Sequence, residues 1–396
     1  MSGITEPELA SLATRFLDAH EYRADDRTGF RGAQFDFGLA WVHFPAGRGG
    51  LGLERAAQSV VTEAFRSRGV PHWDMDVNPI GLGMAAPTLS EWAGEDVQHA
   101  RLRRIFTGQD IWCQMFSEPA AGSDVAGIGT RAVRDGDSWV VSGQKVWTTL
   151  AHKARYGLLL ARTDPGAVKH RGLSYFFVDM SAPGVEVRPL FQMTGDAEFN
   201  EVFLTDVRLP AQSLLGAEGD GWRVAMTTLM NERAAIGGAS GSDSDDLLQA
   251  WRARRPTLED GVDGGLRDLV LRLWVESEAV RLSARRAAAL AGAGVQGPEG
   301  SIAKLAHAES AQRVAELMLE LQGAGAMLHP DGYPMVRTDD SAAHFRSPSK
   351  RFLRSRAFTI EGGTSEVMRN MIGERILGLP PDIRVDKDLP WNKIPR

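Results

Sequence analysis

The spacing of apolar residues changes twice along the chain. Over residues 6–106 apolar side chains recur every three or four positions, which is typical of amphipathic helices. Over residues 111–210 they form short β-rich runs separated by Gly and Asp turns. From Gly221 onward the helical spacing returns in a segment rich in Ala, Leu, Glu and Arg. The pattern predicts a multi-domain α and β protein with the order helices, strands, helices.

The predicted domain boundaries follow these changes in spacing. A segment near residues 237–265 is rich in Gly, Ser and Asp, and we expect a loop insert there with a short amphipathic piece near Leu247–Trp251. The predicted parts are an N-terminal helical domain (1–110), a middle β domain (111–212), a C-terminal helical domain (213–380) and an extended tail (381–396).

Composition narrows the class of protein. The chain has 396 residues, 43% hydrophobic and 24% charged, with a formal net charge of -6, which is ordinary for a globular protein. No Lys- and Arg-rich block indicates a nucleic-acid partner. The N-terminus lacks the pattern of a secretory signal, and no apolar run approaches the roughly 20 residues needed to span a bilayer. Cys113 is the single cysteine, so no intrachain disulfide can form, and we expect a cytoplasmic protein.

Two other kinds of site are not expected. No spacing of Cys or His indicates a metal site. The segment Gly292–Gly297 fits the glycine fingerprint of dinucleotide-binding proteins, but it follows an Ala-rich helical run instead of a strand, and Pro298 comes directly after it. We interpret this segment as a loop between two helices.

Two neighbouring segments of the β domain carry candidate chemistry. In Cys113–Gly127 a short strand runs into a loop of small residues, which lets backbone N–H groups approach a ligand closely. About twenty residues later, Trp147 and Thr149 lie two positions apart on a predicted strand. Residues two apart on a strand share a face, so one segment can offer a stacking surface and a hydrogen bond together.

These segments closely resemble the acyl-CoA dehydrogenase family, and the resemblance covers nearly the whole chain. The Ser-Glu-Pro-x-x-Gly-Ser-Asp loop at Ser117–Asp124 and the Gly-Gly-Thr-Ser-Glu loop at Gly362–Glu366 carry it most specifically. Further matching segments are Phe199–Pro210, Gly219–Trp222, Ser301–Lys304 and Glu374–Pro380. The resemblance implies an N-terminal helical domain, a middle β-barrel or sandwich-like domain and a C-terminal four-helix bundle, with FAD between the β domain and the bundle.

The family resemblance also assigns site residues. Trp147 is expected against the isoalloxazine ring and Thr149 near flavin N5, while Ser123 is also expected to touch the CoA chain. The cofactor-binding residues implied by the resemblance are Met115, Ser117, Gly122, Ser123, Trp147, Thr148, Thr149, Thr364 and Glu366.

The catalytic base has two candidates. In many relatives a Glu immediately precedes the Gly-Thr pair of the C-terminal loop, but here Gly362 stands at that position and Glu361 is one residue too early. Other relatives, including those that handle branched or bulky acyl groups, place the base before an Arg on the first long C-terminal helix, where this chain has Glu232 and Arg233. Glu232 shares a helical stripe with Trp222, Met226, Leu229 and Ile236, and a carboxylate on an apolar face is a stronger base. Glu232 is therefore the expected base and Glu361 the alternative; a purely structural acid at position 232 is a third reading.

Gly362 is expected to contribute through its backbone. In the family the N–H at this position binds the thioester oxygen together with a flavin ribityl hydroxyl, and a backbone donor does not depend on the side chain. The resemblance implies substrate-binding residues at Ser123, Arg233 and Gly362.

The implied function is FAD-dependent α,β-dehydrogenation of an acyl-CoA, with electrons passed to an electron-transfer flavoprotein. The alternatives are an oxidase of the same fold and a catalytically silent subunit of a heteromeric dehydrogenase. A homodimer or homotetramer is expected. Two departures from the family pattern make a heteromer the second expectation. Leu319–Gly325 only loosely matches the family stretch that contacts the FAD of a neighbouring subunit. The family's Arg-x-x-Phe-Gly segment does not occur in Arg252–Arg272.

Overall fold

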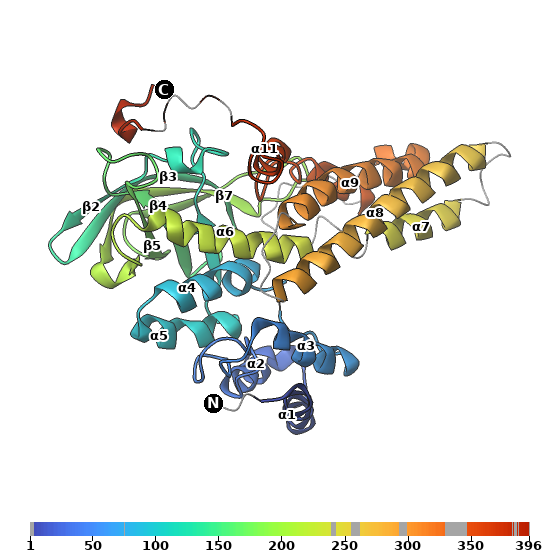
Figure 1. The fold of residues 1–396 in the computed structure, drawn as a ribbon, viewed down its shortest axis with the longest axis horizontal. Coiled ribbons are helices and arrows are strands. Elements are labelled where there is room, and N and C mark those ends of the chain that lie inside the picture. Colours follow the sequence, from blue (N-terminus) through green and yellow to red (C-terminus); the bar gives the residue numbers. More distant parts are fainter. Residues whose placement is uncertain are drawn as a thin grey trace. The chain divides into compact units, whose positions relative to one another are not determined.

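The chain forms two compact units that do not follow the chain order. The computed structural model describes residues 4–74, 76–238, 243–254, 262–292, 299–328, 347–381, 383, 386 and 388–395. The first unit contains residues 1–190, 199–228 and 386–396, and the second contains residues 191–198 and 229–385. Figure 1 follows the elements from the N-terminal helices through the strands to the last helices. The predicted order of helices, strands and helices is confirmed, whereas the predicted domain boundaries stay predictions.

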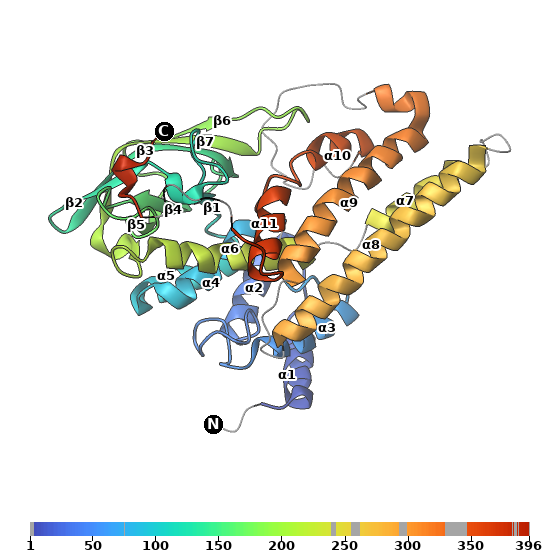
Figure 2. The same cartoon turned by 45° about the horizontal axis from the view of Figure 1, so that its top comes forward.

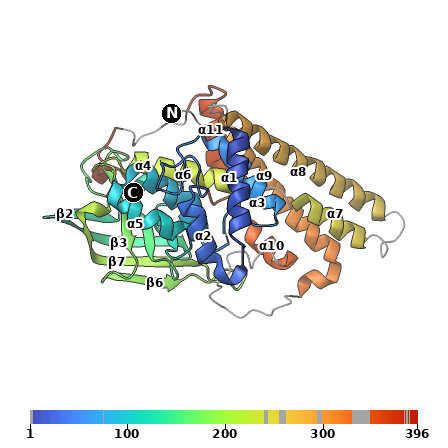
Figure 3. The ribbon, with the colours of Figure 1, turned by 90° about the horizontal axis from the view of Figure 1, so that it is seen from below.

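Five α-helices precede the strands among the described residues of the first unit. They are α1 (Glu6–Ala19), α2 (Arg27–Asp36), α3 (Gln58–Ser67), α4 (Ala86–Trp92) and α5 (Glu95–Phe106). Helix α1 begins at a capping box, in which Glu8 accepts a hydrogen bond from the Thr5 backbone N–H at 2.8 Å. It packs on α3, as Figure 3 shows, through a core that includes Phe16 and Phe65.

The middle of the first unit is a mixed sheet. Its strands are β1 (Trp112–Met115), β2 (Arg131–Asp135), β3 (Ser138–Thr149), β4 (Tyr156–Arg162), β5 (Leu173–Asp179), β6 (Val185–Pro189), β7 (Phe199–Pro210) and β8 (Leu214–Leu215). The strand order is β6-β7-β3-β2-β4-β5-β8, and β1 pairs with β4 in parallel. Strand β4 is buried at every position, because it lies inside the sheet and is covered on both faces.

Helices cover one face of this sheet. In Figures 1 and 3, α4, α5 and the start of α6 (Gly221–Gly238) lie along the same side of the strands. A Cβ placed on Gly221 would lie 2.5 Å from the Ser174 backbone N of β5, so only glycine lets α6 begin this close to the sheet. The indole of Trp92 donates to Thr227 of α6 at 3.0 Å, which ties α4 to the same helix.

The second unit is helical. Its long helices are α7 (Asp243–Arg254), α8 (Val262–Gly292) and α9 (Glu299–Gln322), and Figure 2 shows α7 and α8 running side by side along α9. Their shared core includes Leu247, Leu273 and Leu317. The amphipathic piece expected near Leu247–Trp251 lies in α7, whereas the loop expected around it is helical where the structure describes it, in the rest of α7 and at the start of α8. Apolar contacts with α8 and α9 overcome the weak helix propensity of the Gly, Ser and Asp residues.

Two shorter helices complete the second unit. Helix α10 (Pro348–Ser355) begins at Ser347, whose hydroxyl accepts from the Lys350 N–H at 3.2 Å, and α11 (Ser365–Arg375) begins at Thr364. Both pack on α9. The residues between them form a short loop that carries several of the candidate site residues. Within the described segments, no helix combines the length and the apolar character that crossing a membrane requires.

Candidate active site

The loop between β1 and β2 presents small residues to solvent. After β1 the chain makes a tight turn in which Glu118 and Ala121 exchange two backbone hydrogen bonds of 3.0 Å. Gly122 and Ser123 follow this turn and are exposed. The Val146 N–H donates to the Ser117 carbonyl at 2.9 Å, so the start of the loop is attached to β3 next to Trp147. Met115, in contrast, has a fully buried side chain, so only its backbone could reach a ligand.

A buried ion pair stabilises this loop. Lys145 Nζ lies 2.8 Å from Glu118 Oε1 and donates to the Phe116 carbonyl at 3.0 Å. Glu118 also accepts from the backbone N–H groups of Gly129 at 2.7 Å and Thr130 at 2.9 Å. One carboxylate therefore connects the two ends of the loop. The sequence motif at Ser117–Asp124 contains Glu118, but the sequence alone gave neither Glu118 nor Lys145 a role; a Lys at an inward-facing position of β3 was the available signal.

The ionisation of this pair reflects competition between burial and charge. Burial lowers the pKa of Lys145 to about 8, although Glu118 opposes the shift. Burial also disfavours ionised Glu118, but the charge and hydrogen bond of Lys145, with hydrogen bonds from Thr130 and Gly129, lower its pKa below the usual value. Both side chains are therefore charged near neutral pH, and each buried charge is stabilised by the opposite charge of its partner.

Trp147 stands on an irregular part of β3. Its φ of 59° lies in the left-handed region, and the pairing with β7 shifts register between Lys145 and Thr148. The indole is 60% exposed and meets Phe199 edge-on, with ring centroids 6.0 Å apart. Thr148 is buried and Thr149 partly buried, so Trp147 and Thr149 are more open than the residue between them, as strand alternation predicts. A strained backbone that exposes a large aromatic ring is typical of a ligand-binding position.

Helix α6 carries Glu232. Its most buried positions in the first unit are Gly221, Val224, Ala225 and Thr228, and the Thr228 hydroxyl pairs with the Tyr175 hydroxyl at 2.9 Å. The stripe predicted from sequence through Trp222, Met226 and Leu229 is only partly buried. Glu232 follows Thr228 by four residues, so it continues the buried row, and its own side chain is partly buried. The side chain of Arg233 lies outside the described part of the structure.

The loop before α11 has a backbone that depends on glycine. Gly362 and Gly363 have φ values of 64° and 100°. A Cβ at Gly363 would lie 2.6 Å from the Met368 Cε, so a side chain there would strain the backbone and displace the end of the Met368 side chain. Lys304 of α9, 3% exposed, donates to the carbonyls of Phe358 at 3.1 Å and of Gly363. Sequence reasoning placed Lys304 in a family motif without a role.

Glu361 is bound by a cation. Arg354 Nη2 lies 2.8 Å from Glu361 Oε2, and Arg354 Nε lies 3.5 Å from Glu198 Oε1. Glu198 is 2% exposed, and burial raises its pKa to about 7; Arg354 opposes the shift, while Glu361 and Asp196 reinforce it. Nearby, Lys350 pairs with Asp196 at 3.3 Å. The second unit thus contains a cluster of three acids and two cations around one end of the glycine loop.

Thr364 and Glu366 lie at the start of α11. The Thr364 hydroxyl accepts from the Val367 N–H at 3.1 Å and so caps the helix, which leaves its hydroxyl proton available to a ligand. Glu366 is exposed in the first turn. Both residues are therefore placed where they could contact a bound molecule.

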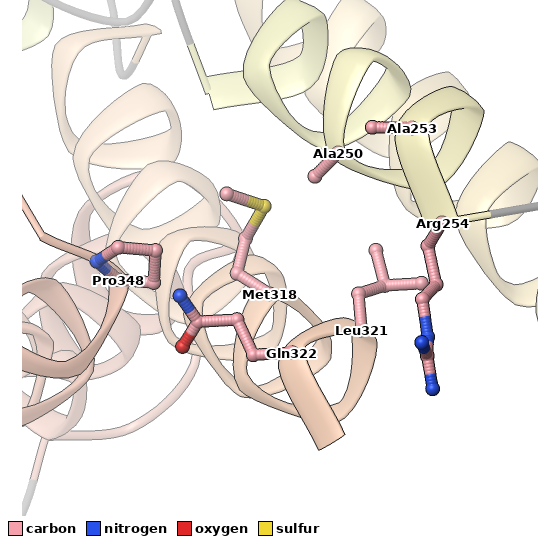
Figure 4. Close-up of a pocket in the computed structure, with 7 residues that line it drawn as sticks. All are labelled: Ala250, Ala253, Arg254, Met318, Leu321, Gln322 and Pro348. Carbon is pink, nitrogen blue, oxygen red and sulfur yellow. The ribbon is translucent and has the colours of Figure 1, made fainter. Parts of the chain in front are cut away.

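A pocket in the second unit involves other residues. It has a volume of about 290 Å³ and lies where α7, α9 and α10 meet, as Figure 4 shows. Its lining is mostly apolar, with Met318 near its centre and the amide of Gln322 at one side. Gln322 belongs to the Leu319–Gly325 stretch, but none of the candidate catalytic residues lines this pocket.

Comparison with known proteins identifies related families and structures. Residues 113–207 match the family described as acyl-CoA dehydrogenase, middle domain, and residues 219–377 match acyl-CoA dehydrogenase, C-terminal domain. These two matches contain the loop after β1, Trp147, Glu232 and Gly362.

Individual relatives agree with these matches. The acyl-CoA dehydrogenase IpdE1 of Mycobacterium tuberculosis is 38% identical over 352 residues, which cover 88% of this chain and 86% of IpdE1. The acyl-CoA dehydrogenase FadE34 of the same organism is 38% identical over 348 residues, or 87% of this chain but 45% of FadE34. The solved structure of the Tcur3481-Tcur3483 steroid ACAD has a TM-score of 0.72 at 25% identity, covering 96% of this chain and 99% of that chain.

Proposed function

Because the chain belongs to the acyl-CoA dehydrogenase family, a family of FAD enzymes, we propose that it removes hydrogens from the α and β carbons of an acyl-CoA thioester. The observation that carries this proposal is Trp147, whose indole is 60% exposed on a left-handed backbone. Such a backbone costs about 1–3 kcal/mol in a non-glycine residue. An exposed aromatic ring held on a strained backbone is what a residue that stacks on a flavin requires.

The residues of the first unit fit FAD. Gly122 and Ser123 are small and exposed, as a loop approached by a pyrophosphate requires, and Thr149 lies on the same strand as Trp147. Ser117 and Thr148 border these positions, and Thr364 and Glu366 of the second unit are proposed to hold the same cofactor. When bound, FAD supplies the acceptor for the β hydride.

Glu232 is proposed as the base that takes the α proton. It is partly buried and continues the buried row of α6, which favours a proton-accepting carboxylate. Glu361, the alternative, is held by Arg354 at 2.8 Å, so its carboxylate is already engaged in an ion pair within the second unit. The ion pair therefore favours Glu232.

Gly362 is proposed to polarise the thioester carbonyl through its backbone N–H. Its φ of 64° and the hydrogen bonds of Lys304 to both sides of this loop support a fixed donor position. A preorganised donor stabilises the charge that develops on the carbonyl oxygen when the α proton leaves. Ser123 and Arg233 are proposed to contact the substrate.

The substrate is proposed to be a bulky acyl-CoA. A base on α6 is the arrangement of relatives that handle branched or bulky acyl groups, and a structural neighbour is a steroid ACAD. We extend this substrate class to the present chain and propose an electron-transfer flavoprotein as acceptor. The two chain names of that neighbour support assembly with a second, different subunit, with a homo-oligomer as the alternative.

An anaerobic titration tests the proposal. The purified protein is mixed with straight-chain, branched and polycyclic acyl-CoA thioesters while the flavin absorption band is recorded. Bleaching by at least one thioester is expected, most strongly with a bulky acyl group. Rapid peroxide formation in air would indicate an oxidase instead, and a colourless protein that binds no added FAD would indicate a silent subunit.

A further inference from the structure

Asp386 and residues 388–395 belong to the first unit and pack against the loop that follows β1. They lie beyond residue 377, where the match to the family's C-terminal domain ends. Pro390 forms an antiparallel bridge with Val168. The N–H groups of Trp391 and Asn392 donate to the chain after β4, at 3.0 Å and 3.1 Å. The segment is therefore attached by its backbone at several successive residues.

Trp391 contacts the returning half of the loop. Its indole N–H donates to the Gly127 carbonyl at 3.1 Å, and its ring lies 3.7 Å from where a Cβ on Gly129 would be. This is an ordinary van der Waals distance, so the indole packs beside Gly129. Trp391 thus contacts the chain at both Gly127 and Gly129.

Trp391 also covers the cation that organises this half of the loop. Arg162, 3% exposed, donates to the carbonyls of Ala126 at 2.6 Å and Ile128 at 3.1 Å. Its guanidinium lies 4.4 Å from the centre of the indole ring, within the range of a cation–π contact. The indole shields these hydrogen bonds from water, which strengthens them.

A second link joins the segment to the exposed end of the loop. Lys169 Nζ lies 2.6 Å from Asp386 and 2.7 Å from Asp124, so one ammonium connects the two carboxylates. Asp124 directly follows Ser123, a residue proposed to contact FAD and the CoA chain. Burial works against the charge on Lys169, but the two carboxylates outweigh it and raise its pKa.

We propose that Trp391 and Asp386 are positioning residues for the loop 117–130, so that the segment 386–395 sets how tightly the chain binds FAD. The inference rests on the proposed role of this loop in cofactor binding. Neither residue needs to touch the cofactor. Trp391 acts through Arg162 and the Gly127 carbonyl, and Asp386 acts through Lys169.

The test compares variants of the segment in the FAD-loaded protein. Trp391→Ala removes the ring and the N–H, Trp391→Phe keeps a ring over Arg162, and Asp386→Asn weakens the link to Lys169. Asn392→Ala is the matched control, because Asn392 is exposed and only its backbone N–H is used. Two quantities are measured: hydrogen–deuterium exchange of residues 117–130, and the rate at which FAD leaves, followed by flavin fluorescence.

Trp391→Ala is expected to speed both exchange of the loop and FAD release, the latter about tenfold for the loss of a hydrogen bond and its shielding ring. Trp391→Phe should recover part of the loss, Asp386→Asn should show a smaller effect, and Asn392→Ala should match the unchanged protein. Turnover at saturating FAD should match that of the unchanged protein in Asn392→Ala, which keeps the backbone hydrogen bond of the segment.

Unchanged FAD release in Trp391→Ala would overturn the inference, as would faster exchange spread over both units instead of the loop. If Trp391→Ala does not fold, Trp391→Phe and Asp386→Asn decide the same question. If the unchanged protein binds no FAD, the proposed function fails, and loop exchange alone then decides whether the segment positions the loop.

Discussion

Arg354 Nη2 lies 2.8 Å from the carboxylate of Glu361. Glu361 directly precedes Gly362, whose backbone N–H is proposed to bind the thioester oxygen. The same guanidinium lies 3.5 Å from Glu198. The Arg354 guanidinium therefore pairs with Glu361, the alternative base, and also connects the glycine loop to Glu198, which directly precedes β7.

The first prediction separates the two candidate bases. Glu232→Gln should keep FAD but slow flavin reduction by an acyl-CoA about 10²–10⁴-fold, the usual contribution of a general base. Glu361→Gln should slow it far less, because Glu361 serves Arg354 instead of the substrate. Anaerobic stopped-flow reduction measures both. The reverse ranking of the two variants would make Glu361 the base.

The second prediction concerns Arg354. Replacing it by Met leaves Glu198 and Glu361 without their shared cation, which should destabilise the protein by about 1–3 kcal/mol, less than for a fully buried pair because the Glu361 side chain is 36% exposed. Flavin reduction should fall roughly 10–100-fold as the glycine loop loses its position. Arg354→Lys should recover part of both losses. A Met variant with unchanged stability and turnover would show that the cluster has no such role.

The hydrogen bonds that Lys304 donates to the glycine loop provide a second test of the role of that loop. Lys304→Met removes its hydrogen bonds to Phe358 and Gly363, so turnover should fall while FAD stays bound. The exposed Lys153→Met is the matched control for loss of a lysine charge. Steady-state kinetics should show the loss mainly in kcat. A change confined to FAD retention would contradict the assignment.

We expect substitutions of Lys145 and Glu118 to have strongly coupled effects on the unfolding free energy. Lys145→Met leaves a buried carboxylate without its cation and should cost about 3–5 kcal/mol. The double variant Lys145→Met/Glu118→Gln removes both charges and should be more stable than Lys145→Met alone. Chemical denaturation of the two single variants and the double variant gives the coupling free energy. Simple additivity would mean that the two side chains act independently.

Glu198 predicts a pH dependence of stability. Its pKa is raised from 4.5 to about 7 in the folded protein, so between these pH values the folded state holds more protons than the unfolded state. The unfolding free energy therefore falls as pH rises from 4.5 to 7, by about 3 kcal/mol from this group. Glu198→Gln removes the effect.

Calorimetry of the unchanged protein and Glu198→Gln at pH 5 and pH 8 measures this dependence. The melting temperature of the variant relative to the unchanged protein should be higher at pH 8 than at pH 5. Equal differences at both pH values would mean that Glu198 titrates normally.

Local sequence signals predicted the order of the elements, because the change in apolar spacing predicted the sheet between helical segments. The shared strand face of Trp147 and Thr149 stays a prediction, since β3 is irregular between Lys145 and Thr148. Helix α7 was predicted only as a short amphipathic piece near Leu247–Trp251, because the Ser and Asp residues at its start favour loops, and its apolar side chains pack in a core shared with α8 and α9.

Ion pairs between residues far apart in the sequence could not be predicted from local sequence patterns. Lys145 and Glu118 are 27 residues apart, and neither position shows from its neighbours which partner it meets. Arg354 meets Glu198 across most of the second unit's sequence, so no pattern along the chain predicts that one cation serves two acids. The left-handed φ of Trp147 is likewise a product of the register shift between β3 and β7.

The return of residues 386–395 to the first unit affects the order in which the chain can fold during synthesis. Domains made early on the ribosome commonly fold before later segments emerge. Here the first unit gains Trp391 and Asp386 only after all of residues 229–385 have been made, so it must wait in an unfinished state throughout that time. A nascent chain halted before residue 386 should therefore expose the loop 117–130 to proteases that the finished protein resists.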